Sequence, residues 1–290
     1  MSYPVAGQFQ EIEGLLVSPG LEFDLDSWST KVHYYFSQDR LEAKDSWAHQ
    51  DFLTRAHGLD FQAEYLEADD WRLLWGGSWE EESFRKVALP TGVPEVDDSL
   101  ITKSAFVQLR YLGWEESEWA LGARTDDFSD FGGAQTWSLS GSRKVFDTLS
   151  LFSRFATSFA PPQANDLYGI WGNPLLNPEE AKSWEVGLKG VSEDWRWRLG
   201  AYRTDFRDLI SWSGFTTANI GRARAEGIEF SAERSFDGFL FRTGYAYGEA
   251  WDEVESTRLL RRPRHSGNFA VERRNDKFGF GFELTWVADR

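Results

Sequence analysis

The four histidines, His33, His49, His57 and His265, are the first residues to test for metal or acid–base chemistry. Their spacing matches no zinc-ligand pattern, and no His-Glu-x-x-His sequence is present. We expect His49 and His57 to lie in loops or in a polar lumen. His33 falls in a strand-like segment, so it is the one histidine that a hydrolytic Ser/His or Asp/His site on a strand would use.

Carboxylates are numerous and often adjacent. The adjacent groups are Asp69-Asp70, Glu80-Glu81-Glu82, Asp97-Asp98 and Asp126-Asp127. Neighbours in a strand point to opposite faces, so adjacency alone does not build the paired carboxylates of a glycosidase. Asp126, Asp127 and Asp130 would offer the oxygen ligands that calcium takes, but solvated loop acids are the preferred interpretation. We therefore assign no metal ligand.

Motifs for covalent or cofactor chemistry are missing from the sequence. It has no cysteine, no Gly-x-Ser-x-Gly and no Gly-x-x-x-x-Gly-Lys. Gly279 and Gly281 lie inside a strand-like run and cannot open a phosphate-binding helix. We predict no catalytic residue, no cofactor and no enzyme activity.

The composition combines many aromatic residues with a polar chain. Aromatics make up 16% of the residues, with 15 Trp, while the mean hydropathy is −0.50. Membrane barrels place aromatics at both interfaces and polar side chains in the lumen; a Trp-rich soluble propeller or sandwich is the alternative that composition leaves open. The formal charge is −16 with no basic stripe, which argues against a nucleic-acid partner.

Alternation with a period of two predicts the elements that position these residues. In residues 278–286, Phe278, Phe280, Phe282, Leu284 and Trp286 share one face, and glycine, Glu and Thr share the other. Residues 239–248 and 195–200 alternate in the same way, with Arg198 and Gly200 on the polar face. Small residues and arginines on one face suit a wet lumen, because a dry core would require a partner for every charge.

The predicted connections alternate between short and long, as in outer-membrane barrels with tight turns on one side and long loops on the other. The short ones fall at 115–117, 144–147, 192–194, 235–238 and 275–277. The long ones fall at 126–133, 160–182, 208–222 and 249–264. We count about fifteen strands, with the weakest candidates at 23–37, 41–47 and 59–67. An odd count, together with the missing signal peptide and the strand-like end, leads us to expect an internal piece of a larger barrel.

Four segments resemble TonB-dependent outer-membrane receptors, and most closely the cobalamin (vitamin B12) receptor group. They are 158–168, which ends in Asp-Leu-Tyr; 172–187, with Gly-Asn-Pro, Pro-Glu and Trp-Glu-Val-Gly; 219–229, with Ala-Glu-Gly-Ile-Glu; and 259–263, with Leu-Leu-Arg-Arg-Pro. Residues 124–127 share the likeness. Ala160 and Pro161 depart from the family's common basic residue and alanine, which we interpret as loop variation.

The resemblance implies an all-β, antiparallel up-and-down transmembrane barrel of about 22 strands in the bacterial outer membrane. Residues 1–290 would form one partial barrel domain without the plug. The implied partners are cobalamin or a similar large ligand, TonB through the plug region, and outer-membrane lipid. The segments 160–182, 208–222 and 249–264 would line the ligand vestibule. An iron–siderophore or other cargo is the runner-up; an outer-membrane enzyme using His33, or an engineered β scaffold, are alternatives of other classes.

Overall fold

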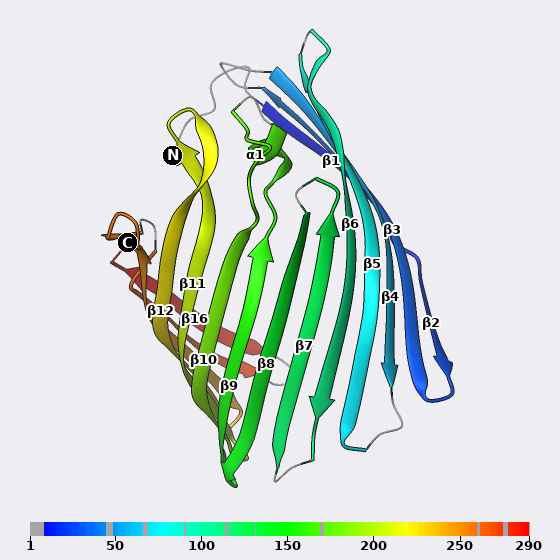
Figure 1. The fold of residues 1–290 in the computed structure, drawn as a ribbon. Helices are drawn as coiled ribbons and strands as arrows, with labels where there is room; N and C mark the ends of the chain where they lie inside the picture. The colour runs from blue at the N-terminus through cyan, green and yellow to red at the C-terminus, as the bar shows by residue number, and fades with distance from the viewer. Residues whose placement is uncertain are drawn as a thin grey trace.

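The computed structural model describes residues 9–44, 49–65, 69–89, 91–113, 116–130, 132–168, 171–259, 262–274 and 278–289, which form one antiparallel sheet of sixteen strands (Figure 1). The strands are β1 (Phe9–Val17), β2 (Gly20–Leu25), β3 (Trp28–Lys44), β4 (His49–Tyr65), β5 (Trp71–Ala88), β6 (Val93–Tyr111), β7 (Ser117–Phe128), β8 (Gly132–Phe146), β9 (Leu149–Ala160), β10 (Glu179–Val191), β11 (Trp195–Ser213), β12 (Thr216–Phe236), β13 (Phe239–Asp252), β14 (Thr257–Arg258), β15 (His265–Arg274) and β16 (Gly279–Ala288). The described chain also holds one short helix, α1 (Ala164–Tyr168). The predicted all-β architecture is confirmed, with sixteen strands where about fifteen were expected.

Strand order follows chain order almost throughout, which is the up-and-down topology that the short turns predict. β1 and β2 pair with successive parts of β3 in one register, since Val17 lies opposite Phe36 and Gly20 opposite His33. Pro19 separates them because it has no N–H to donate to the ladder. Among the described residues, β1 and β16 are the two ends of the sheet and do not pair with each other.

The weakest strand predictions need correction. A single strand at 23–37 is wrong, because β2 and β3 are joined by a turn at Asp26 and Ser27, where Asp26 has a φ of 50°. Asp tolerates this left-handed conformation better than most residues. The candidates at 41–47 and 59–67 are the ends of β3 and β4 as far as residues 44 and 65; 45–47 and 66–67 lie outside the described residues. The turn at 235–238 is confirmed and narrows to Asp237 and Gly238, both with positive φ, as a two-residue hairpin turn needs.

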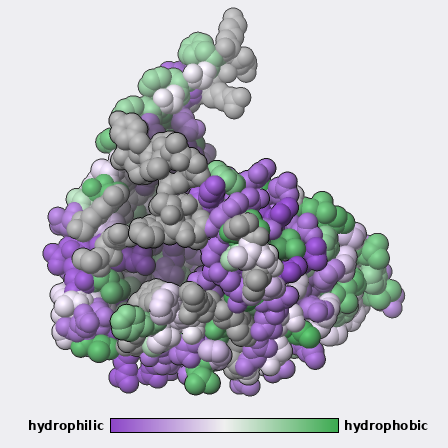
Figure 2. Space-filling view, turned by 90° about the horizontal axis from the view of Figure 1, so that it is seen from above, coloured by the Kyte–Doolittle hydropathy of each residue, from purple (hydrophilic) through white to green (hydrophobic). Residues whose placement is uncertain are grey.

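The two faces of the sheet differ in chemistry. Along β10, even-numbered side chains such as Trp184 and Val186 are exposed on the outward face, and odd-numbered ones such as Ser183 and Glu185 lie on the inward face. Seen from above in Figure 2, hydrophilic residues are visible inside the hollow, and hydrophobic residues gather at the right-hand outer edge. The wet inner face predicted from Arg198 and Gly200 is therefore present. No helix of the described part of the chain is long and apolar enough to span a membrane.

The outward apolar band has a measurable height. On β5 it begins at Trp71, continues through Trp75 to Trp79 and ends at Glu81. Trp71 to Trp79 spans nine residues, close to the ~9–11 residues with which a tilted strand crosses a bilayer. On β11 the same distance separates Trp195 from Arg203. Trp195 therefore marks the edge of the apolar band next to the short turn at 192–194, and Arg203 lies at the opposite edge of the band.

Few large apolar side chains are buried in the described residues. Packing within the wall comes instead from aromatic rings that lie over glycines on neighbouring strands. The ring of Phe152 lies over Gly187 and near Gly200, which are cross-strand partners on the inward face. A Cβ on Gly187 would overlap the carbonyl oxygen of Leu199 and lie 2.5 Å from Cζ of Phe152. Glycine is therefore required at position 187 by the close approach of backbone and ring.

Candidate functional site

Two of the three predicted vestibule segments are folded against each other. The segment 160–182 contains α1, in which Leu167 is 4% exposed, and a following stretch in which Leu176 is 2% exposed. The backbone N–H groups of Asp166 and Leu167 bond to the carbonyl of Gln163, which closes the helical turn. From residue 179 onward this segment is not loop but strand β10.

The prediction of a loop at 208–222 is wrong. β11 continues to Ser213 and β12 starts at Thr216, so the segment is a hairpin whose two-residue turn begins with Gly214 at a φ of 68°. Glycine at the first turn position, flanked by strand-forming residues, was the sequence signal for this hairpin. The connection predicted at 126–133 is also shorter than expected, because β7 extends to Phe128 and β8 starts at Gly132.

The hairpin tip holds the preceding segment through backbone and amide groups. Thr217 Oγ1 donates to the carbonyl of Asp166 at 2.9 Å, and Asn173 Nδ2 donates to the carbonyl of Thr217 at 3.2 Å. Asn219 Oδ1 accepts from the N–H of Asn177 at 2.8 Å, while its Nδ2 donates to the Asn177 carbonyl at 2.9 Å. Such paired amide bonds fix the path of the connection above the sheet.

The third segment, 249–264, contacts the same region through β12. Its start is strand, since β13 runs to Asp252, and residues 257–258 form β14. The N–H of Glu253 donates to the carbonyl of Arg222 at 2.8 Å, and Arg264 forms an ion pair with Glu249 at 3.2 Å. The structure therefore brings the three predicted segments together at one end of β10–β13.

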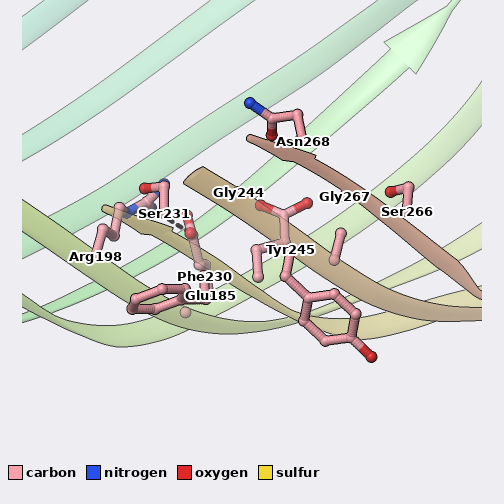
Figure 3. A pocket seen from close by; sticks show the side chains of 12 residues that line it. Glu185, Arg198, Phe230, Ser231, Gly244, Tyr245, Ser266, Gly267 and Asn268 are labelled. Atoms are coloured by element: carbon pink, nitrogen blue, oxygen red, sulfur yellow. Dashed lines mark hydrogen bonds and ion pairs between the residues drawn. The ribbon is translucent and has the colours of Figure 1, made fainter. Parts of the chain in front are cut away.

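Below these segments, the inward face of β9–β15 carries two adjoining cavities, of about 220 and 460 Å³, which share Glu185, Arg198 and Glu229. Figure 3 shows the smaller one, with Ser231, Ser266 and Asn268 around it. Arg198 forms an ion pair with Glu185, and its guanidinium lies 4.4 Å from the centre of the Phe152 ring. Charges of both signs, hydroxyls and amides on a wet wall suit a polar solute or another polar protein surface, and they present no nucleophile beside a base.

His33 lies apart from this wall, on β3. His33 Nε2 is 2.5 Å from Ser18 Oγ, and its Nδ1 is 3.5 Å from an oxygen of Asp60. The sequence argument missed Ser18 because it lies in the break before Pro19. Ser18, His33 and Asp60 follow one another in the order of a Ser/His/Asp hydrolytic triad. The distance between His33 and Asp60, however, exceeds the length of an ordinary hydrogen bond.

The remaining histidines and the Asp126 group have structural partners. His49 pairs with Glu42 at 2.8 Å, and His57 and His265 lie beside tyrosine hydroxyls. Asp126 is 3% exposed and accepts three hydrogen bonds from Arg124, so it is not oriented toward Asp127 or Asp130. Within the described ranges, no group of three or more acids or histidines is placed to hold a metal ion.

An antiparallel sheet with an aromatic-bounded apolar outer band and a polar inner face defines a transmembrane β-barrel wall. Residues 6–290 match the family model described as TonB dependent receptor-like, beta-barrel. The chain belongs to this family, whose barrels reside in the bacterial outer membrane. In such barrels the side with the longer connections, here 161–178 and 253–264, faces the cell exterior, and the opposite side, with the turns at 192–194 and 237–238, faces the periplasm.

Solved structures share the fold at low sequence identity. The siderophore receptor PirA from Acinetobacter baumannii matches with a TM-score of 0.84 and 16% identity over 95% of this chain and 50% of that one. The ferric enterobactin receptor PfeA from Pseudomonas aeruginosa, a G324V mutant, matches with a TM-score of 0.83 and 15% identity over 96% and 49%. The copper transporter OprC matches with a TM-score of 0.81 and 14% identity over 96% and 53%. The chain thus spans about half the length of the structures it resembles.

Proposed function

We propose that this chain forms the wall of a TonB-dependent transport receptor that carries a large, scarce nutrient across the outer membrane. The observation that carries the proposal is the match of residues 6–290 to the receptor barrel family. In this proposal, residues 1–290 are one partial domain of a barrel of about 22 strands. A plug would fill the lumen, and TonB would act on that plug.

The vestibule is the region where we place cargo capture. In support of this, hydrogen bonds hold the segment 160–182 on the segment 208–222, and the segment 249–264 bonds to Arg222 at the end of the second. A braced connection loses less entropy on binding than a free loop, which favours capture of a dilute ligand. The inner wall around Arg198 then offers a polar path toward the plug.

Two cargo classes remain in the proposal. The sequence resemblance favours cobalamin, whereas the structural neighbours include receptors described as binding siderophores and a copper transporter. These neighbours support an iron–siderophore cargo at least as well. The same family and neighbours are receptors and transporters, so an enzyme is not part of the proposal.

The test is uptake by cells that express the full-length receptor, with and without TonB, supplied with cyanocobalamin or ferric enterobactin. We expect saturable uptake of one probe that is lost without TonB. Replacing 171–178 by a Gly-Ser stretch of equal length should weaken capture of that probe, whereas the same replacement at the periplasmic turn 192–194 should not. Receptor-independent uptake of both probes, or uptake that persists without TonB, would refute the transport proposal.

A further inference from the structure

A cavity of about 320 Å³ lies outside the lumen, among β10, β11 and β12. Its charged lining comprises Lys182, Arg203, Arg207, Arg222 and Arg224, with Glu180, Asp205 and Glu253. These positions share the outward face, because Trp184 lies opposite Arg203, and Arg207 lies opposite Arg222. We call this set the outer arginine cavity. It holds five cations and three acids in a chain whose formal charge is −16.

The outer arginine cavity sits at the extracellular boundary of the apolar band. Trp184 is exposed at its floor, and the Arg203 guanidinium lies 5.3 Å from the centre of that ring. On the membrane side of this level the outward residues turn apolar, as Val186 and Leu199 show. Tryptophan marks the headgroup level of a bilayer, so the cations above it stand where outer-leaflet lipid headgroups lie.

Part of the outer arginine cavity is internally neutralised. Asp205 accepts from Arg203 and from Arg224, both at 3.0 Å, and Arg224 also pairs with Glu253 at 2.6 Å. Burial opposes ionisation of Asp205, but the hydrogen bonds from the two arginines outweigh it and lower the pKa of its carboxyl. Arg203 and Arg224 are thereby held in fixed orientations.

Three cations of the outer arginine cavity are left over. Lys182, Arg207 and Arg222 are exposed, and none of their side chains has an ion pair or hydrogen bond within the described part of the chain. Glu180 lies opposite Arg207 in the register without forming an ion pair. Arg207 and Arg222 lie directly opposite each other, an arrangement of like charges that destabilises a sheet. An anion bound between the two arginines would attract both guanidinium groups and offset their mutual repulsion.

We propose that the outer arginine cavity binds the phosphate group of an outer-leaflet lipid whose acyl chains lie on the apolar band below Trp184. Arginine suits this role because its planar fork meets two phosphate oxygens at once. The lipid is distinct from the transported cargo, since the cavity faces away from the lumen. Its binding would anchor the receptor at a fixed depth and brace the base of the β11–β12 hairpin.

The test uses the full-length receptor in detergent and native mass spectrometry with diphosphorylated lipid A as the probe. We expect Arg207→Gln/Arg222→Gln to weaken binding of this lipid at least tenfold. The matched control is Arg234→Gln/Arg273→Gln, which removes two outward arginines stacked on aromatics at the periplasmic end. The control should bind as tightly as the parent.

Three further outcomes decide the source and the role of the anion. The parent and Arg207→Gln/Arg222→Gln should bind dephosphorylated lipid A with the same affinity. Inorganic phosphate that competes at the same concentration as the lipid would overturn the lipid assignment. Without lipid, relief of the like-charge pair should leave the double variant at least as heat-resistant as the parent; a large loss of heat resistance, or unchanged lipid affinity, would overturn the proposal.

Discussion

Gly187→Ala is the substitution whose effect follows most directly from the wall's packing. The added Cβ would overlap the carbonyl oxygen of Leu199, which is backbone, and would lie 2.5 Å from Cζ of Phe152. Overpacking of this kind costs about 1–3 kcal/mol. Alanine recovers about 0.5 kcal/mol of backbone entropy relative to glycine in a strand. We therefore expect Gly187→Ala to lower the free energy of unfolding by about 1.5 kcal/mol.

Gly200→Ala is the matched control because it occupies the cross-strand partner position on the same inward face. Its Cβ would lie 3.2 Å from Glu185 Oε1, the end of a flexible side chain, and 3.6 Å from the Phe152 ring. This variant should be as stable as the parent or more stable by about 0.5 kcal/mol.

The assay for both glycine variants is urea unfolding of the full-length receptor in detergent, followed by the heat-dependent shift of its gel band. Adding Phe152→Leu to Gly187→Ala should restore part of the lost free energy of unfolding, because it removes the contact with the ring and leaves the contact with the backbone. The reasoning is refuted if Gly187→Ala and Gly200→Ala unfold at the same urea concentration.

Three other predictions follow from the loops, the outer surface and the histidine group. Asn219→Ala should speed chymotrypsin cleavage within 171–178 by about tenfold or more, since its amide bonds are worth about 1 kcal/mol each. The lowered pKa of Asp205 implies stabilisation that is present above its unfolded pKa of about 3.9 and is lost as pH falls through the folded value; the parent should therefore lose more urea resistance between pH 7 and pH 3 than Asp205→Asn. Ser18→Ala and His33→Ala should leave hydrolysis of a short-chain p-nitrophenyl ester at the background rate of the parent.

Each of these predictions has a control or a contrary outcome. Asn268→Ala, on the inner wall, should not change cleavage within 171–178, and equal acceleration by both variants would show general loosening. Asp237→Asn, at a periplasmic turn, should keep the parent's pH response. An ester hydrolysis rate above background that either Ser18→Ala or His33→Ala abolishes would establish an enzyme where none is expected.

The class of fold and the chemistry of each face of the sheet could be predicted from the sequence alone. Alternation is a local property of the chain, so residues such as Arg198 and Gly200 could be assigned to a wet face before any partner strand was known. Short turns at Asp237-Gly238 and at 192–194 carry their own local signals and were predicted correctly. The family resemblance also came from local segments, and the family match confirms it at the level of the receptor barrel.

The ends of the strands and the pairing of charges became visible only in the folded sheet. Polar residues in 208–222 indicated a loop, because a strand that rises above the membrane no longer needs an apolar face, and its hairpin becomes visible only through pairing. The outer arginine cavity depends on register: a shift of one residue between β11 and β12 would move Arg207 away from Arg222. Alternation places each side chain on a face, but the pairing of strands far apart in the sequence decides its neighbours.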